Sequence, residues 1–111
     1  MTIDDKLLKK YAPMTETAFY ILFNLQTENH GYNITKEVAE LTHQEVIIGA
    51  GTMYGSLGKF EKDGLIALSH QEENRKYYQL TALGKELLAM ERKRIDRLYQ
   101  NSHRMIAPNV E

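Results

Sequence analysis

The feature that most constrains the fold is a helical segment at residues 49–64, because the chain changes from helical to strand periodicity immediately after it. Met53, Leu57 and Phe60 recur at positions i, i+4 and i+7, which places three apolar side chains on one face of a helix. Gly64 follows as a helix terminator, and beyond it apolar and polar residues alternate as in a β-strand. The segment therefore predicts a helix that packs against a core and leads directly into a sheet.

The outer face of this helix carries side chains that are either small or basic. Thr52, Gly55, Lys59 and Lys62 lie opposite the apolar face, and Thr52 is the expected N-cap. One interpretation is a surface helix weakened by glycine, which costs about 1 kcal/mol relative to alanine. The other is a helix whose backbone approaches a phosphate group closely. Gly55 has the stronger physical basis for this second role, because no side chain blocks the approach near the helix N-terminus.

The residues before this segment predict further helices. A short amphipathic helix that contains Leu7 and Leu8 is expected to end near Pro13. A strongly apolar helix follows from about Thr15 and requires burial on more than one side. A polar turn at Gly31 then separates it from a shorter third helix.

The residues after Gly64 predict a hairpin and a final helix. Two alternating segments flank the polar residues 71–74, which form the expected hairpin tip. Tyr77 and Tyr78 point to opposite faces of the second strand, so that one belongs to the core. Thr81 is the expected cap of a long last helix, and the tail from Ala107 is expected to fray.

The order of these elements predicts a mainly α fold with a small β-hairpin, namely a winged helix-turn-helix plus a long C-terminal dimerisation helix. We expect one domain over residues 1–111, with the winged body at 14–80 and the dimerisation helix at 81–106. A final helix of roughly 20 residues is about 30 Å long, which exceeds what so small a domain can cover. Its apolar stripe therefore predicts a second copy of the chain as a partner.

Composition narrows the function classes. The net charge is −1, but residues 1–50 hold four Lys and seven acidic residues (4 − 7 = −3) and residues 51–111 hold ten Lys or Arg and eight acidic residues (10 − 8 = +2). A nucleic-acid surface would therefore be local. The longest apolar run is the six residues 18–23, so we expect no membrane span and no signal peptide, and a cytoplasmic location. The chain has no cysteine, which excludes disulfides and thiolate metal sites.

The chain resembles the PadR family of winged-helix transcriptional regulators, in its short form with a single C-terminal dimerisation helix. Four segments within residues 14–90 carry the resemblance: ETAFYILFNL, HGYNITKEV, GAGTMYGSLGKFEKDGLI and RKYYQLTALGKELL. The Gly-Thr-x-Tyr and Arg-Lys-Tyr-Tyr-x-Leu-Thr motifs are fairly specific in combination. The resemblance implies a homodimeric, ligand-responsive repressor whose third body helix enters the major groove of double-stranded operator DNA while the hairpin wing touches the DNA backbone.

Position by position, the resemblance implies a set of DNA-binding residues in the third helix and the wing. The residues carried over by position are Thr52, Tyr54, Lys59, Arg75 and Lys76; the full set expected to bind DNA also contains Gly51, Gly55, Ser56 and Asn74. Packing at the edge of the core is the alternative role for Tyr54, and solvation is the alternative for Lys59. For Arg75 and Lys76 the alternative is cross-strand pairing with Glu72 or Glu73.

Two positions depart from the pattern of the family. Gly58 stands where many relatives have a basic or polar residue, and the wing tip carries Glu72 and Glu73 where relatives often have Gly and Arg. Both departures lower the electrostatic affinity for DNA, so we expect weak or strongly salt-sensitive non-specific binding.

A second set of residues is assigned to dimerisation and to an effector. The expected dimerisation residues are Leu7, Leu8, Tyr11, Leu88, Ile95, Leu98 and Tyr99. The resemblance implies a small aromatic or cationic effector near Phe19, Phe23, Ile95 and Tyr99, although these four residues are better explained as plain dimer core.

No catalytic or metal chemistry is expected. The four histidines lack ligand spacing, and no nucleophile–base pair or phosphate-cradling glycine loop is present, so we expect no cofactor, no metal and no enzymatic activity. Two other functions remain open. One is a winged-helix module that binds proteins through its acidic wing. The other is a small-molecule-sensing protein with vestigial DNA binding.

Overall fold

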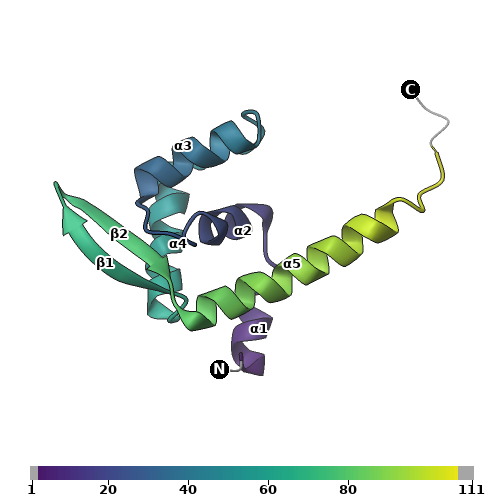
Figure 1. The fold of residues 1–111 in the computed structure, drawn as a ribbon, viewed down its shortest axis with the longest axis horizontal. Coiled ribbons are helices and arrows are strands. Elements are labelled where there is room, and N and C mark those ends of the chain that lie inside the picture. The colour runs from purple at the N-terminus through teal and green to yellow at the C-terminus, as the bar shows by residue number, and fades with distance from the viewer. Residues whose placement is uncertain (1–2, 108–111) are drawn as a thin grey trace.

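The computed structural model describes residues 3–107, so residues 1–2 and most of the tail that was expected to fray (residues 108–111) lie outside the described residues. The fold is a mainly helical winged helix-turn-helix with a two-stranded hairpin and a long last helix, as predicted (Figure 1). The elements are α1 (Asp5–Tyr11), α2 (Glu16–Phe23), α3 (Gly31–Leu41), α4 (Ala50–Lys62), β1 (Ile66–Glu72), β2 (Arg75–Leu80) and α5 (Ala82–Ser102).

The ends of α4 confirm one expectation and correct another. Gly64 has φ +78°, the left-handed conformation that ends a helix, and it follows the C-cap Asp63. The N-cap, however, is Gly49, and no side chain bonds to the first turn. Thr52 was the expected N-cap, and this prediction was wrong because α4 begins at Ala50, so that Thr52 already lies inside the first turn.

The last helix is slightly shorter than predicted. Thr81 caps α5 as expected, since its hydroxyl oxygen accepts the Gly84 N–H at 3.1 Å. The helix ends at Ser102, whereas the expected end was residue 106. The chain beyond it changes to tighter turns, in which His103 and Arg104 donate to carbonyls three residues back.

The hairpin forms the wing. Strands β1 and β2 are antiparallel, and Glu73 and Asn74 form a two-residue turn in which both φ angles are positive, 50° and 65°. The base of β2 is anchored to the body, because Leu80 N–H donates to the Leu25 carbonyl at 2.9 Å and Tyr78 pairs with Asn29. The tip of the wing therefore extends beyond a fixed base (Figure 1).

The core is built from the apolar faces of α2, α3 and α4, the start of the hairpin and the first half of α5. Met53, Leu57 and Phe60 are all buried in it, as their spacing predicted. Tyr11 and Leu88 were assigned to a dimer interface, but both are buried in the core of the single chain. Tyr11 packs against Phe60 with ring centroids 5.7 Å apart, so α1 folds back onto its own body.

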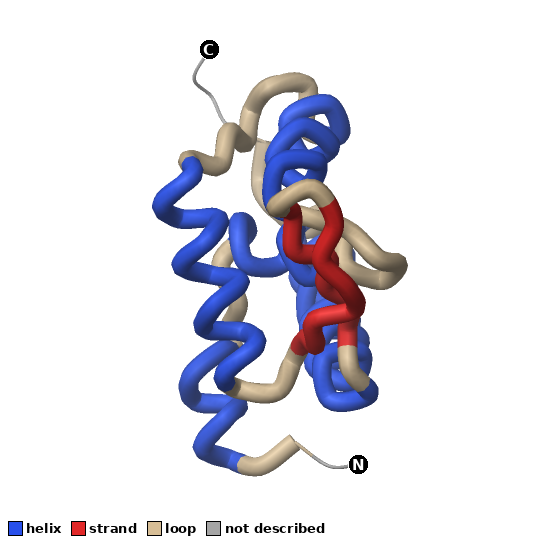
Figure 2. The backbone as a smooth tube through the Cα atoms, turned by 90° about the vertical axis from the view of Figure 1, so that its left-hand side faces the viewer, coloured by secondary structure: helices blue, strands red, loops and turns tan. Residues whose placement is uncertain are grey.

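Helix α5 leaves the body half-way along its length. Glu91, whose exposed fraction is 3 %, is the last buried residue of α5, and its carboxylate accepts the Met14 N–H at 2.6 Å and is bound by Arg94. The C-terminal part of α5 then projects away from the three-helix body (Figure 1), and in the turned view the last helix lies to one side of the hairpin (Figure 2). Within residues 3–107, no helix is both long and apolar enough to cross a membrane.

Candidate nucleic-acid interface

The outer face of α4 is centred on glycine. At about 100° per residue, Gly51, Gly55, Gly58 and Lys62 lie opposite the buried stripe, and all four are exposed. A Cβ atom added at any of the three glycines would meet nothing within 4 Å. The fold itself therefore does not require glycine at these positions, and their effect is to leave the helix backbone open to an external surface.

Two groups of side chains flank this glycine face. Thr52 and Lys59 were expected opposite the apolar face, but they are exposed on the flank toward α1, where Ser56 between them is half-buried. Tyr54 lies on the side toward the wing and is 59 % exposed. Its ring also rests on Gly31 at the start of α3, where an added Cβ would be only 2.8 Å from the Tyr54 Cε1. Tyr54 is thus held by packing on one side and accessible on the other.

The wing carries its basic residues next to α3. Arg75 lies over the ring of Tyr32, with its guanidinium carbon 5.4 Å from the ring centroid. Tyr32 is 65 % exposed, so its ring is not packed beneath the wing. Its exposed ring supports Arg75 from the α3 side.

Cross-strand pairing does not occupy the basic residues of the wing. Glu72 is opposite Arg75 in the register, but its carboxylate lies 3.5 Å from Nε2 of His70 instead. Within residues 3–107, no ion pair joins Arg75 or Lys76 to Glu72 or Glu73. The two basic side chains near the tip of the wing are therefore available to an anion.

A concave surface joins α4 to the wing. This cavity has a volume of about 440 Å³ and lies between the start of α3, α4 and the second strand. Its rim includes Tyr54 from α4 and Asn74, Arg75 and Lys76 from the wing, with Glu61 as its acidic group. The structure thus brings Tyr54 together with the three wing residues predicted for DNA binding, whereas Lys59 lies on the other flank of α4.

His30 supports this cavity in a role that sequence reasoning missed. Its Nδ1 accepts the Asn33 N–H at 3.3 Å and so caps α3, and its ring forms a T-shaped pair with the Tyr77 ring, with centroids 5.0 Å apart. Burial, together with the positive charge of Arg75, lowers the pKa of His30 below its usual value. Histidine is an uncommon N-cap, so the sequence offered only its position before Gly31 as a signal.

A second contact that the sequence did not predict joins the C-terminal end of α4 to α1. The Tyr11 hydroxyl donates to the carboxylate of Asp63, and Lys10 Nζ lies 2.8 Å from the same carboxylate. These two hydrogen bonds, that of Lys10 first, lower the pKa of Asp63. Tyr11 and Asp63 are 52 residues apart, so no local pattern could have linked them.

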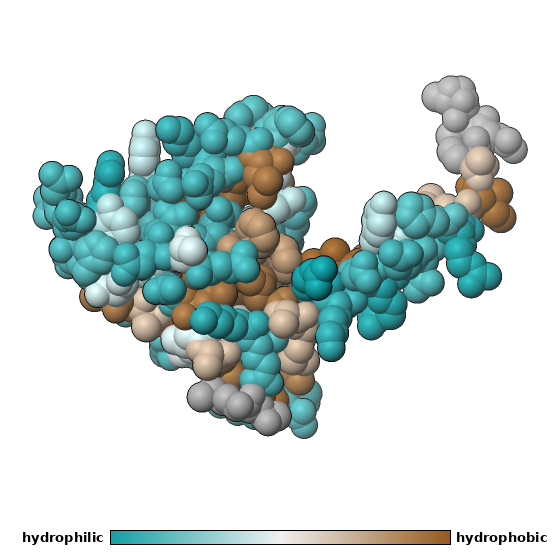
Figure 3. All heavy atoms as spheres, viewed as in Figure 1, coloured by the Kyte–Doolittle hydropathy of each residue, from teal (hydrophilic) through white to brown (hydrophobic). Residues whose placement is uncertain are grey.

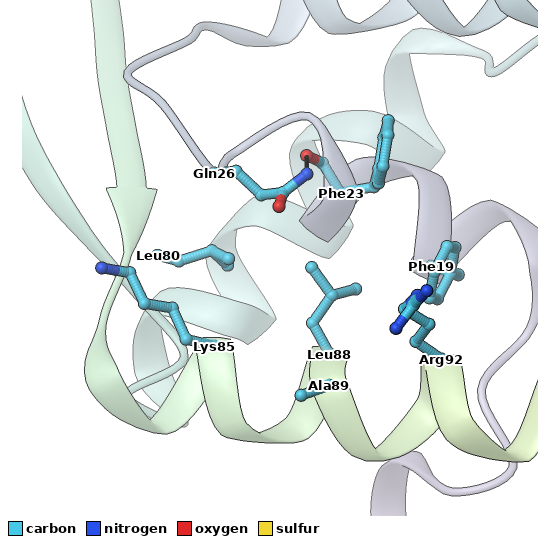
Figure 4. Close-up of a pocket in the computed structure, with 8 residues that line it drawn as sticks. All are labelled: Phe19, Phe23, Gln26, Leu80, Lys85, Leu88, Ala89 and Arg92. Atoms are coloured by element: carbon cyan, nitrogen blue, oxygen red, sulfur yellow. Dashed lines mark hydrogen bonds between the residues drawn. The ribbon is translucent and has the colours of Figure 1, made fainter.

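The predicted effector residues are not gathered in one cavity. Phe19 and Phe23 stack with centroids 6.2 Å apart and line a cavity of about 530 Å³ between α2 and α5, with Lys85 and Arg92 at its edge (Figure 4). Ile95 lines a neighbouring cavity of about 320 Å³. Tyr99 lines neither of these two cavities and contacts His103 instead.

The remaining dimerisation residues have two different environments. Leu7 and Leu8 are half-buried against the core of their own chain. Ile95, Leu98 and Tyr99 are exposed on the projecting part of α5, and Leu98 is 62 % exposed. In Figure 3 the hydrophobic surface gathers around the place where α5 leaves the body, while the α3 and wing surfaces are mostly hydrophilic.

The chain matches a protein-family model and the sequence of a known protein. The family model described as "Transcriptional regulator PadR-like family" matches residues 21–90. "Uncharacterized protein X" of Lysinibacillus sphaericus is 30 % identical over 69 residues, which are 59 % of this chain and 63 % of that protein, so the chain spans less than two thirds of this relative.

Solved structures share the fold. A transcriptional regulator from Clostridium thermocellum has a TM-score of 0.72 at 22 % identity, with 96 % of this chain and 100 % of that chain covered. Bacillus subtilis PadR in complex with operator DNA has a TM-score of 0.58 at 24 % identity, with 87 % of this chain and 52 % of that chain covered.

Proposed function

Because the chain belongs to the PadR-like family of transcriptional regulators, which are not enzymes, we propose that it is a homodimeric, ligand-responsive repressor that binds duplex operator DNA. Helix α4 enters the major groove, and the wing contacts the adjacent phosphate backbone. Support comes from the shared fold with a PadR structure that holds operator DNA and from the winged architecture of this chain.

The observation that carries this proposal is the open glycine face of α4 beside basic residues that form no ion pair within residues 3–107. Gly51, Gly55 and Gly58 leave room for close approach. Exposed lysines on α4 and the basic pair of the wing lie around that face and supply phosphate contacts. The low net charge of the chain does not oppose this role, because charge acts locally and four basic residues are exposed on α4 and the wing: Lys59, Lys62, Arg75 and Lys76.

The homodimer is supported by the projecting half of α5. Its apolar residues Ile95, Leu98 and Tyr99 are exposed within the described residues 3–107, and a second α5 of the same sequence would cover them. Two copies of α4 would then read two half-sites about 34–36 Å apart, or a multiple of that spacing.

Of the small aromatic or cationic effector that was expected, the cavity between α2 and α5 favours the aromatic and not the cationic kind. Lys85 and Arg92 are its charged lining residues, so it favours an aromatic or apolar compound that carries a negative charge. We expect an anionic naphthalene sulfonate to bind the full chain more tightly than a cationic dye of similar size. R92A should weaken that binding and R97A should not, whereas equal binding by the R92A variant would exclude this cavity as the site.

The DNA proposal is tested with a duplex enriched from a random-sequence library by the wild-type chain. Replacement of Lys59, Arg75 and Lys76 by alanine should abolish tight binding and reduce the salt dependence by about 0.9 per lost phosphate contact. Replacement of Lys6, Lys93 and Arg97, three exposed basic residues elsewhere, changes the net charge equally and is the control. A wild-type chain that enriches no duplex would contradict the proposal and favour a protein-binding or purely ligand-sensing module.

A further inference from the structure

Lys59 of α4 lies four residues before Asp63, the C-cap of this helix, and the two residues are not paired as this spacing would suggest. Side chains at i and i+4 on a helix are neighbours, and a lysine and an aspartate at this spacing commonly pair. Within residues 3–107 no ion pair joins them, because the Asp63 carboxylate is bound by Lys10 at 2.8 Å and by the Tyr11 hydroxyl. Both residues that bind Asp63 belong to α1, and Tyr11 is its last residue.

Lys59 acts on the Asp63 carboxylate only through space, as the last of the charges that lower its pKa, and its direct contact is with Tyr11. Its Nζ lies over the ring of Tyr11, 5.1 Å from the centroid. An aromatic face attracts a cation without supplying an opposite formal charge, and the ammonium group keeps N–H donors for another acceptor. The same tyrosine therefore binds Asp63 through its hydroxyl and supports Lys59 through its ring.

We propose that α1 controls the DNA affinity of α4 by sequestering Asp63: while Lys10 and Tyr11 hold this carboxylate, Lys59 is free to bind a phosphate group, and when α1 leaves α4 the carboxylate pairs with Lys59. This inference rests on the proposed function, since it assumes that α4 binds DNA. Lys10, Tyr11 and Asp63 are positioning residues in this arrangement, and Lys59 is the residue that contacts the phosphate.

The structure makes α1 a suitable control element. It has seven residues, too few for an isolated helix to be stable in water, so its presence depends on packing against the body. That packing is provided by Tyr11, which is buried, and by Leu7 and Leu8, which are half-buried. Anything that competes for these apolar side chains would also release Asp63.

The test measures affinity for the library-enriched duplex at several salt concentrations, with wild type, K10A, D63N and K10A/D63N. We expect K10A to weaken binding about two- to fivefold per half-site, the range typical of exposed ion pairs, and to reduce the salt dependence. D63N should improve binding much more in the K10A background than in wild type, because only there does Asp63 compete for Lys59. K9A removes a positive charge from the same helix, but Lys9 does not pair with Asp63, so K9A should weaken DNA binding less than K10A does.

Two further variants separate this role from direct contact or misfolding. Y11F keeps the aromatic ring but loses the hydroxyl that binds Asp63, so it should weaken DNA binding. Adding D63N should restore binding to Y11F, as it does to K10A. In a K59A background, K10A should have no further effect. Equal gains from D63N in both backgrounds, or equal losses in K9A and K10A, would overturn the inference. These results differ from failure of the proposed function, in which the wild-type chain binds no duplex.

Discussion

The carbonyl oxygen of Leu65 lies against Gly84, so closely that a Cβ atom on Gly84 would be 2.1 Å from it. The same carbonyl accepts the Thr81 N–H at 3.0 Å, and the Thr81 hydroxyl donates to the Gly64 carbonyl at 2.6 Å. The first turn of α5 is therefore fixed to the end of α4 and the start of the wing. This junction determines how the last helix is oriented relative to the DNA-binding surface.

G84A should destabilise the protein. The added methyl group meets a backbone carbonyl that is itself hydrogen-bonded, so the helix or the strand must move. Overpacking of this kind costs about 1–3 kcal/mol, which thermal or urea denaturation would detect as a lower free energy of unfolding. G58A is the control, because its Cβ meets nothing within 4 Å and alanine favours a helix. If both variants were equally stable, the close approach at Gly84 would be refuted.

G55A should affect stability and DNA binding in opposite directions. Alanine has a higher helix propensity than glycine, so the free energy of unfolding should rise by up to about 1 kcal/mol. The new methyl group points outward from the centre of the open face of α4 and should weaken binding of the library-enriched duplex. Unfolding curves and fluorescence anisotropy on the same preparation measure the two effects. Unchanged DNA affinity would show that the glycine face is not in contact with DNA.

H30N should reduce the pH dependence of stability. The pKa of His30 is lower in the folded chain than its usual value of about 6.5, so the unfolded state binds more protons and stability falls as the pH falls through this range. Asparagine caps a helix without titrating. Wild type should therefore lose more stability than H30N between about pH 7.5 and pH 5. If wild type and H30N lost the same free energy of unfolding over this pH range in chemical denaturation, His30 would not contribute to the pH dependence.

L98D should convert the proposed dimer to a monomer. Leu98 is 62 % exposed on the projecting half of α5, so a carboxylate there is harmless in one chain but is buried without a partner in a dimer interface. Light scattering after size-exclusion chromatography measures the mass directly. R97D places the same charge on an exposed neighbour of the same helix and should leave the dimer intact, and an L98D protein that remained dimeric would exclude this face of α5.

The sequence by itself determined the elements and their faces, because these depend on residues a few positions apart. The spacing of Met53, Leu57 and Phe60 selected the buried face of α4, and Gly64 and Thr81 marked helix ends that the structure confirms. Only the tertiary structure decided which surfaces meet. It buried Tyr11 and Leu88 within one chain and removed Thr52 from the cap position. It also joined Asp63 to α1 across 52 residues, because partners distant in sequence are chosen by packing and charge in three dimensions rather than by local periodicity.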